Sequence, residues 1–330
     1  MHRLLSLSSA LVLLLICCVA AAQPLREVRR IDLPQASGRI DHMAFDPSSA
    51  RVYVAALGSD AVEVVDMDAG RVIGELTGLR EPQGVLALPG SKRVLVTNGD
   101  AEYASVFDAA TLQSLTRIAL PWDSDNVRLE ANTGRVWIGC GSRRGSALLV
   151  VDPATDEATR SIPLPAHPES FQLERSGERI FVNVPAARAV LVLSRATGRT
   201  VSRWPLPGLD NFPMALDEAQ GRLLIGTRAP ARLMVLDTTS GALLAQVPTV
   251  RDADDIFVDE QTQRLYVAGG EGYVEAFARE QGDEYRSLQR FATRPGARTA
   301  LFLPERRLLL VALPRRGASP AQILVLSTEP

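Results

Sequence analysis

Cysteine, lysine and long apolar runs are all scarce in this chain of 330 residues. Two of the three cysteines, Cys17 and Cys18, lie in an apolar N-terminal segment, so only Cys140 remains beyond it. One cysteine excludes an internal disulfide framework, and the hydrophobic core must therefore hold the fold together. Lys92 is the only lysine, so nearly all of the positive charge is carried by arginine.

The chain also has no large excess of positive or negative charge, because 36 basic and 38 acidic residues leave a formal charge of −2. This balance argues against a nucleic-acid partner, which would require a basic surface. The sequence contains no G-x-S-x-G, no H-E-x-x-H and no paired-cysteine zinc motif. It therefore shows no signature of a serine hydrolase, a zinc protease or a zinc finger.

The N-terminus has the pattern of a secretory signal peptide over residues 1–22. A short positive start precedes an apolar stretch at 4–19, and three alanines at 20–22 form a small-residue cleavage site. We therefore expect an exported protein, either periplasmic or secreted. A lipid anchor at Cys17 or Cys18 and an uncleaved anchor are the alternatives, although the residues before these cysteines do not suit lipid attachment. No later run is long enough to span a bilayer, so no membrane span is expected after cleavage.

A strand-like segment that begins with arginine recurs at intervals of 42 to 44 residues. Its seven copies begin at Arg51, Arg93, Arg135, Arg179, Arg222, Arg264 and Arg307. A second apolar strand follows each copy, and several of these end in aspartate before a turn such as DMDAG or DTTSG. Asp66, the first of these aspartates, is expected to cap the amides of its turn. Each period has room for four strands and shows no helical periodicity, which predicts an all-β, seven-bladed β-propeller.

The seventh period lacks its outer strand, because only three residues follow ILVLS. The segment LREVRRIDLP at 25–34 can supply that strand and close the ring, which would remove two unpaired edges. We therefore expect one domain over 23–330. Its blades would cover approximately 38–79, 80–121, 122–165, 166–208, 209–250, 251–295 and, together with 25–34, 296–330.

The repeats resemble those of a known group of proteins. RVYVAALGSDAVEVVD at 51–66, VLVTN at 94–98 and RLYVAGG at 264–270 resemble the YVTN-type repeats of bacterial seven-bladed propellers. This group includes YncE-like periplasmic proteins and 6-phosphogluconolactonase-like propellers. The resemblance covers 25–330 and implies the fold. It does not imply an activity, because the matching residues are structural strands.

The residues just before each first strand of a blade differ from one period to the next. The residues ten positions before the repeated arginines are Asp41, Gln83, Asp125, Glu169, Phe212, Asp254 and Ala297. The residues nine positions before them are His42, Gly84, Asn126, Ser170, Pro213, Asp255 and Arg298. In a propeller these crossovers lie on one face around the central channel. We therefore predict a ligand-binding ring made of Asp41, His42, Gln83, Asp125, Asn126, His167, Glu169, Asn211, Asp254, Asp255 and Arg298.

Carboxylates gathered at one channel mouth repel one another unless they are protonated or neutralised. Ion pairs can neutralise them, either with Arg298 or with the arginines of neighbouring loops at 143, 144, 188, 228 and 232. A divalent cation, calcium or magnesium, is the second possibility, with Asp125, Glu169, Asp254 and His42 as its ligands. An organic ligand is the third. Trp122, Trp204 and Phe212 could stack on it, although we expect these aromatic residues to fill space between blades. Cys140 is expected to be a packed small residue, with a reactive thiol as the alternative.

Three functions fit these observations. The first is a binding module whose loop face holds an unknown protein or small molecule, and we expect it to be a monomer. The second is a metal-dependent lactonase or lyase that uses a carboxylate or His42 as its general base. The third is single-stranded DNA binding, as the resemblance to YncE-like proteins implies, but the acidic mouth argues against it.

Overall fold

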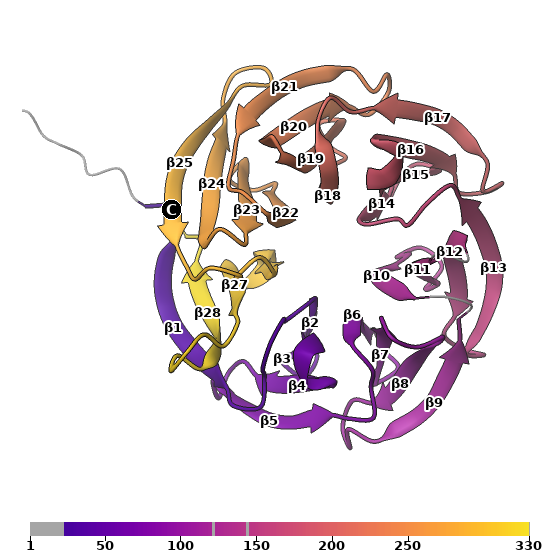
Figure 1. Ribbon diagram of the computed structural model, residues 1–330, viewed down its shortest axis with the longest axis vertical. Helices are drawn as coiled ribbons and strands as arrows, with labels where there is room; N and C mark the ends of the chain where they lie inside the picture. The colour runs from indigo at the N-terminus through magenta and orange to yellow at the C-terminus, as the bar shows by residue number, and fades with distance from the viewer. Residues whose placement is uncertain (1–22, 121–122, 143–144, 330) are drawn as a thin grey trace, which may run out of the picture.

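Seven four-stranded antiparallel sheets surround a central channel in the computed structural model (Figure 1), which describes residues 23–120, 123–142 and 145–329. Each sheet runs from an inner strand at the channel to an outer strand at the rim. The predicted seven-bladed propeller is therefore confirmed. In the described part of the chain, no helix is long and apolar enough to cross a membrane.

The first three blades each follow the chain outward from the channel. Blade 1 contains β2 (Met43–Asp46), β3 (Arg51–Ala56), β4 (Ala61–Asp66) and β5 (Arg71–Leu76). Blade 2 contains β6 (Pro82–Leu88), β7 (Arg93–Asn98), β8 (Tyr103–Asp108) and β9 (Ser114–Ala119). Blade 3 contains β10 (Ser124–Leu129), β11 (Val136–Ser142), β12 (Gly145–Asp152) and β13 (Glu157–Leu164).

The next three blades repeat this order. Blade 4 contains β14 (Phe171–Leu173), β15 (Arg179–Val184), β16 (Ala189–Ser194) and β17 (Thr200–Pro205). Blade 5 contains β18 (Leu209–Asp217), β19 (Arg222–Ala229), β20 (Ala231–Asp237) and β21 (Leu243–Pro248). Blade 6 contains β22 (Ala253–Asp259), β23 (Arg264–Gly269), β24 (Tyr273–Arg279) and β25 (Tyr285–Ala292). Three short 3₁₀ turns are η1 (Leu57–Ser59), η2 (Pro185–Ala187) and η3 (Pro304–Arg306).

Blade 7 is built from both ends of the chain. β26 (Ala300–Leu303), β27 (Leu308–Leu313) and β28 (Ala321–Ser327) form its inner part, and β1 (Arg26–Leu33) pairs with β28 as the outer strand. The register runs from Arg26 opposite Ser327 to Leu33 opposite Ala321. The predicted closure of the ring by the N-terminal strand is therefore confirmed. In Figure 1 the indigo β1 lies beside the yellow β28.

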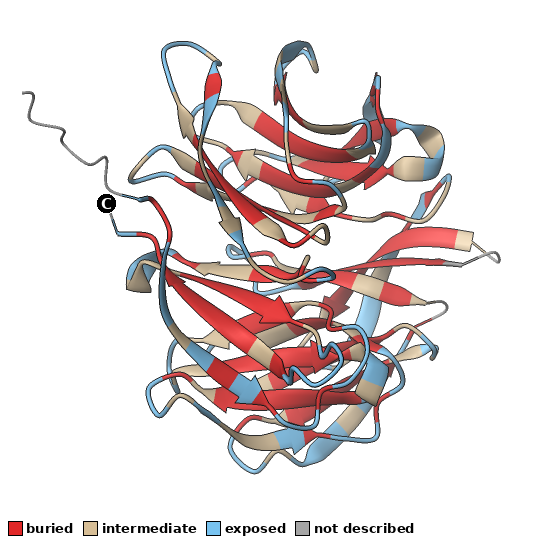
Figure 2. Ribbon diagram, turned by 60° about the vertical axis from the view of Figure 1, so that its left-hand side comes forward, coloured by how far each residue is buried: buried red, intermediate tan, exposed pale blue. Residues whose placement is uncertain are grey.

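The core lies between the blades, because the two middle strands of each sheet are covered on both faces. β3, with the sequence RVYVAA, is buried at every position after its arginine, whereas β17 at the rim exposes most of its residues. Figure 2 shows the buried residues concentrated in the strands and the exposed ones at the turns and the rim. The expected cap on the following turn is also present, since Asp66 accepts hydrogen bonds from the amides of Asp68 and Ala69.

Several of the repeated arginines stabilise the contact between neighbouring blades. Arg93 of blade 2 forms an ion pair of 2.6 Å with Asp156 of blade 3, and Arg222 of blade 5 forms one of 2.6 Å with Asp283 of blade 6. The side chain of Arg51 donates to the carbonyl of Ala109 in blade 2. Arginine can reach a neighbouring blade in this way because its long side chain ends in a planar group with several donors.

Candidate functional site

The seven inner strands and the crossovers before them line one cavity of about 580 Å³ at a mouth of the channel. Thirteen of the fourteen ring positions identified in the sequence line this cavity, and Ala297 is the exception. The ten predicted site residues among the cavity's lining are Asp41, His42, Gln83, Asp125, Asn126, His167, Glu169, Asp254, Asp255 and Arg298. Asn211 is the one predicted site residue that does not line it.

Bulges in the first hairpins of four blades help to direct ring residues toward the mouth. The pairing shifts register between Ser124 and Val127, and equivalent shifts occur in blades 2, 5 and 6. A bulge leaves its extra residue outside the ladder and bends the strand. Asp125 and Asn126 lie inside the bulge of blade 3, so these polar residues face the mouth even though the sheet around them is apolar.

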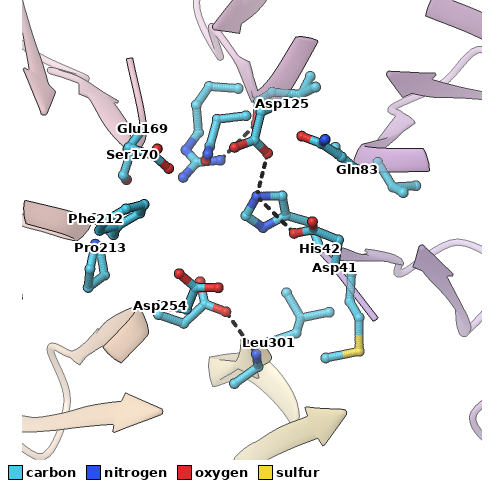
Figure 3. Close-up of a pocket in the computed structure, with 18 of the residues that line it drawn as sticks. Asp41, His42, Gln83, Asp125, Glu169, Ser170, Phe212, Pro213, Asp254 and Leu301 are labelled. Carbon is cyan, nitrogen blue, oxygen red and sulfur yellow. Dashed lines mark hydrogen bonds and ion pairs between the residues drawn. The ribbon is translucent and has the colours of Figure 1, made fainter. Parts of the chain in front are cut away.

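His42 lies between two carboxylates on one side of the cavity (Figure 3). Its Nε2 is 3.1 Å from Asp125 Oδ1 and 3.8 Å from Asp41 Oδ1, and Asp41 pairs with Arg39 at 2.9 Å. Burial alone would lower the pKa of His42, but the hydrogen bond to Asp125 and the charge of Asp41 raise it to about 10. Burial raises the pKa of Asp41 to about 6 despite the opposing effect of His42.

This arrangement corrects one expectation from the sequence. A general base must be able to accept a proton at the working pH, and with a pKa of about 10 His42 already carries its proton near neutrality. Burial opposes ionisation of Asp125, yet the hydrogen bond from His42 and nearby positive charge lower the pKa of this carboxyl. His42 is therefore placed as a protonated hydrogen-bond donor to Asp125.

A second ionic network occupies the opposite side of the mouth. Arg228 contacts Asp254 at 2.5 Å and Asp252 at 3.3 Å, and Arg298 contacts Asp252 at 2.9 Å. The guanidinium of Arg228 also lies 3.8 Å from the ring centroid of Phe212, which is a cation–π contact. Arg228 and Arg298 therefore neutralise Asp252 and Asp254 through ion pairs, which is one of the possibilities that the sequence indicated for the ring.

Asp255 faces the boundary between blades 6 and 7. Its Oδ2 accepts a hydrogen bond of 2.8 Å from the amide of Ala300, the first residue of β26. Burial raises the pKa of this carboxyl to about 7, although the positive charge of His42 opposes the effect. Asp255 therefore helps to position blade 7 and remains largely protonated below neutral pH.

Asp125, His167 and Glu169 form a third group, and their donor atoms lie within 4.8 Å of one another. The ring of His167 is oriented by a contact of 2.7 Å between its Nδ1 and the carbonyl of Gly141. Glu169 makes no ion pair or hydrogen bond through its carboxylate within the described residues. Burial, together with the negative charge of Asp125, raises the pKa of Glu169 to about 7.

Asn211 is fully buried behind the mouth. Its amide nitrogen donates to Asn183 Oδ1 at 3.0 Å and to the carbonyl of Ala189 at 3.3 Å. Asn211 therefore packs in the core between blades 4 and 5, and the prediction that places it in the ligand ring is not supported. The sequence could not reveal this, because a shift of one residue at the bulge decides which side chain faces the channel.

Most of the aromatic residues and the cysteine that were considered for ligand contact or reactivity do not lie at the channel mouth. Trp204 packs against Phe181 with ring centroids 5.6 Å apart, in the core between blades 4 and 5. Of the aromatic candidates, Phe212 lies at the mouth, and Trp122 falls outside the described residues, as do the arginines at 143 and 144. Cys140 is completely buried, and burial raises the pKa of its thiol well above the usual range. It is a packed core residue.

The ring predicted from the sequence omitted four charged residues that line the cavity: Arg39, Asp123, Arg128 and Arg228. Asp123 was visible as part of a D-x-D pair with Asp125. Arg128 stands where the aligned residues Leu86 and Phe257 of other inner strands are apolar, and that contrast was the available signal. Three of the four arginines that line the cavity are ion-paired, whereas Arg128 has no carboxylate partner within the part of the chain that the structure describes.

Comparisons with known proteins establish the fold and nothing finer. No family model matches this chain, and no curated protein sequence matches it. Among solved structures, the chain is similar to Kuenenia stuttgartiensis hydrazine synthase, with a TM-score of 0.75 and 16% identity over 85% of this chain and 93% of that chain. At such low identity the likeness concerns the fold alone. Membership in the YVTN-repeat group therefore stays a prediction. The chain is a seven-bladed β-propeller with a polar cavity at its channel mouth.

Proposed function

We propose that this protein is an exported binding module that holds a small polar ligand in the cavity at the channel mouth. The signal-like segment at 1–22 supports export, because it combines a positive start, an apolar stretch and a small-residue cleavage site. The cavity supports a small ligand and not a macromolecule, since its volume of about 580 Å³ lies in the range of small-molecule sites.

The observation that carries this proposal is the chemical variety of one structurally equivalent position. The residue ten places before each repeated arginine is an aspartate in three blades, and in the others a glutamine, a glutamate, a phenylalanine or an alanine. A ring that only had to close the channel could use one small residue in every blade. In this ring the side chains differ in charge, polarity and size from blade to blade, as recognition of an asymmetric molecule requires.

The charges at the mouth indicate what kind of ligand fits. Cationic groups, including Arg228, His42 and Arg298, lie around the same space as Asp125 and Glu169. A ligand with hydrogen-bonding oxygens can meet both signs of charge. An apolar ligand would displace water from these charged groups without replacing the hydrogen bonds that the water makes, at a cost of several kcal/mol. Phe212 adds one apolar face beside Arg228.

Thermal melting of the mature protein with small polar probes tests this proposal. Suitable probes are citrate, gluconate, gluconolactone, glutamate and arginine, each at millimolar concentration. We expect at least one of them to raise the melting temperature of the wild type. Gln83→Trp, which narrows the mouth, should remove that shift, whereas Gln220→Trp, in an exposed turn at the opposite end of blade 5, should retain it.

Two results would contradict the proposal. One is that no probe shifts the melting temperature. The other is that the stabilising probes act equally on Gln83→Trp and on the wild type, because binding would then lie away from the mouth.

A second candidate is a metal-dependent lactonase or lyase at the same mouth. The group formed by Asp125, His167 and Glu169 favours it, since three protein ligands leave coordination positions open for water and substrate. Hydrolysis of gluconolactone, followed by acid release with and without chelator, distinguishes the enzyme from the binding module. Hydrolysis that the chelator abolishes would establish catalysis on this substrate.

A further inference from the structure

Asp125, His167 and Glu169 come from two consecutive segments of the ring. Asp125 belongs to the bulge in β10, and the other two residues belong to the crossover between blades 3 and 4. Their donor atoms lie within 4.8 Å of one another, so small side-chain rotations bring all three to a common ion. In Figure 3 the carboxylates of Asp125 and Glu169 both point into the open space of the mouth.

His167 is held in the orientation that a metal ligand requires. A carbonyl can only accept a hydrogen bond, so the contact of 2.7 Å with Gly141 places the proton of a neutral imidazole on Nδ1. Nε2 then carries the free lone pair. A hydrogen bond from the second ring nitrogen to a backbone carbonyl is the usual support of a metal-binding histidine.

The space beside His167 is also fixed by the backbone. A Cβ added to Gly141 would lie 2.8 Å from His167 Nδ1 and 2.9 Å from its Cα. Glycine at this position therefore allows the imidazole to approach the strand closely enough for its contact with the carbonyl.

The two carboxylates of this group lack a full set of partners. Asp125 uses Oδ1 for His42, and no hydrogen bond to its other oxygen occurs within the described residues. The carboxylate of Glu169 has neither an ion pair nor a hydrogen bond within those residues. Beside them, Oδ1 of Asp123 is shielded from solvent and has no hydrogen-bond partner among the residues that the structure describes. Asp125 and Glu169 lie close enough to repel each other when both are ionised, and a cation between them would relieve that repulsion.

Two other carboxylates at the mouth are already paired with arginines. Asp254 is paired with Arg228, and Asp41 is paired with Arg39. His42 is already engaged, because its Nε2 lies 3.1 Å from Asp125 Oδ1. The ligand set predicted from the sequence therefore changes, because Asp125 and Glu169 remain, His167 enters, and His42 and Asp254 leave.

We propose that Asp125, His167 and Glu169 bind one divalent transition-metal ion, zinc or manganese, in preference to calcium or magnesium. One imidazole with two carboxylates is a mixed nitrogen and oxygen set, whereas calcium and magnesium prefer oxygen alone. This inference rests on the proposed ligand site and deepens it, since the ion's open positions would meet the oxygen atoms of the bound molecule.

Metal binding to chelator-treated mature protein tests the inference. Each of Zn²⁺, Mn²⁺, Ca²⁺ and Mg²⁺ is titrated separately by calorimetry without any organic ligand, and bound metal is counted by mass spectrometry after desalting. We expect one equivalent of Zn²⁺ or Mn²⁺ to bind at least tenfold more tightly than Ca²⁺ or Mg²⁺. Asp125→Asn and Glu169→Gln should each weaken that binding at least tenfold.

Asp254→Asn is the matched control, because it makes the same chemical change at the equivalent position of blade 6. It should alter the affinity by less than about threefold. Gly141→Ala should weaken binding while both carboxylates stay in place, since the added Cβ displaces His167. A variant that fails to fold is recognised by circular dichroism, and the remaining variants still decide the result.

Three outcomes would overturn the inference: no stoichiometric binding of any of the four ions, tighter binding of calcium or magnesium, or equal losses in Asp254→Asn and Asp125→Asn. If no ion binds but probes still stabilise the wild type through the mouth, the metal site fails and the ligand site stands. If an ion binds but no organic probe does, the metal site stands and the ligand proposal fails.

Discussion

The closing strand β1 offers the most direct test of the architecture. Leu33 is fully buried in the cluster that joins blade 7 to blade 1, and Ile31 beside it is 1% exposed. Val28, on the same strand, is 51% exposed at the rim. Truncating a buried leucine to alanine removes apolar burial and leaves a cavity, which together cost about 2–5 kcal/mol. Truncating the exposed valine should change stability by about 0.5 kcal/mol or less.

We therefore expect Leu33→Ala to lower the melting temperature by roughly 4–10 °C, at about 2 °C per kcal/mol for a domain of this size. Val28→Ala should melt within about 1 °C of the wild type. Deleting residues 23–34 should cost more than Leu33→Ala, because it also removes the whole β1–β28 ladder. Circular dichroism melts of the mature chain measure all three.

The reasoning would be refuted if the deletion melted like the wild type. Equal effects of Leu33→Ala and Val28→Ala would refute it as well, since the burial difference along β1 would then carry no free energy. Urea unfolding gives an independent check, because the deletion should lower the midpoint.

Three further predictions follow from charge and burial. The pKa of His42 is about 10 in the folded protein and 6.5 in the unfolded chain, so protonated His42 stabilises the fold fully below pH 6.5 and this contribution is lost as the pH rises through 10. The urea midpoint of chelator-treated protein should therefore fall between pH 6.5 and 10. The fall should be smaller in His42→Gln. Cys140 should resist an aromatic disulfide reagent until the protein is denatured, and rapid labelling of the native state would contradict its burial. Arg222→Gln should lower the melting temperature by a few degrees, because it leaves Asp283 without its 2.6 Å partner, and Asp283→Asn combined with it should recover part of the loss.

The fold could be predicted from the sequence because the information is repeated. The segment that begins with arginine occurs seven times in the sequence, so an error in interpreting one copy is corrected by the others. The incomplete seventh period also indicated where the N-terminal strand belongs. The burial of β3 agrees with this repeat pattern, since every residue of the strand after Arg51 is buried.

The site was predictable only in outline. Equivalence among blades placed Asp125 and Asp254 at the mouth, but it could not show that one pairs with His42 and the other with Arg228. Partner choice depends on the reach and rotamer of individual side chains, which differ from blade to blade and carry no repeat signal. Asn211 was misplaced for another reason, because the register shift at the bulge decides which side chain faces the channel. Arg128 was overlooked although it contrasts with the apolar residues at the aligned positions 86 and 257.

The pairing of β1 with β28 also sets an order of events during synthesis. β1 ends at Leu33 and β28 begins at Ala321, so the growing chain carries β1 without its partner while the segment between them is made. Local sheets such as β2–β5 can form as they appear, whereas closure requires a contact across nearly the entire sequence. Until then both edges of the open ring can pair with other chains. Protection of these edges by a chaperone during synthesis would therefore benefit this protein more than protection of any single blade.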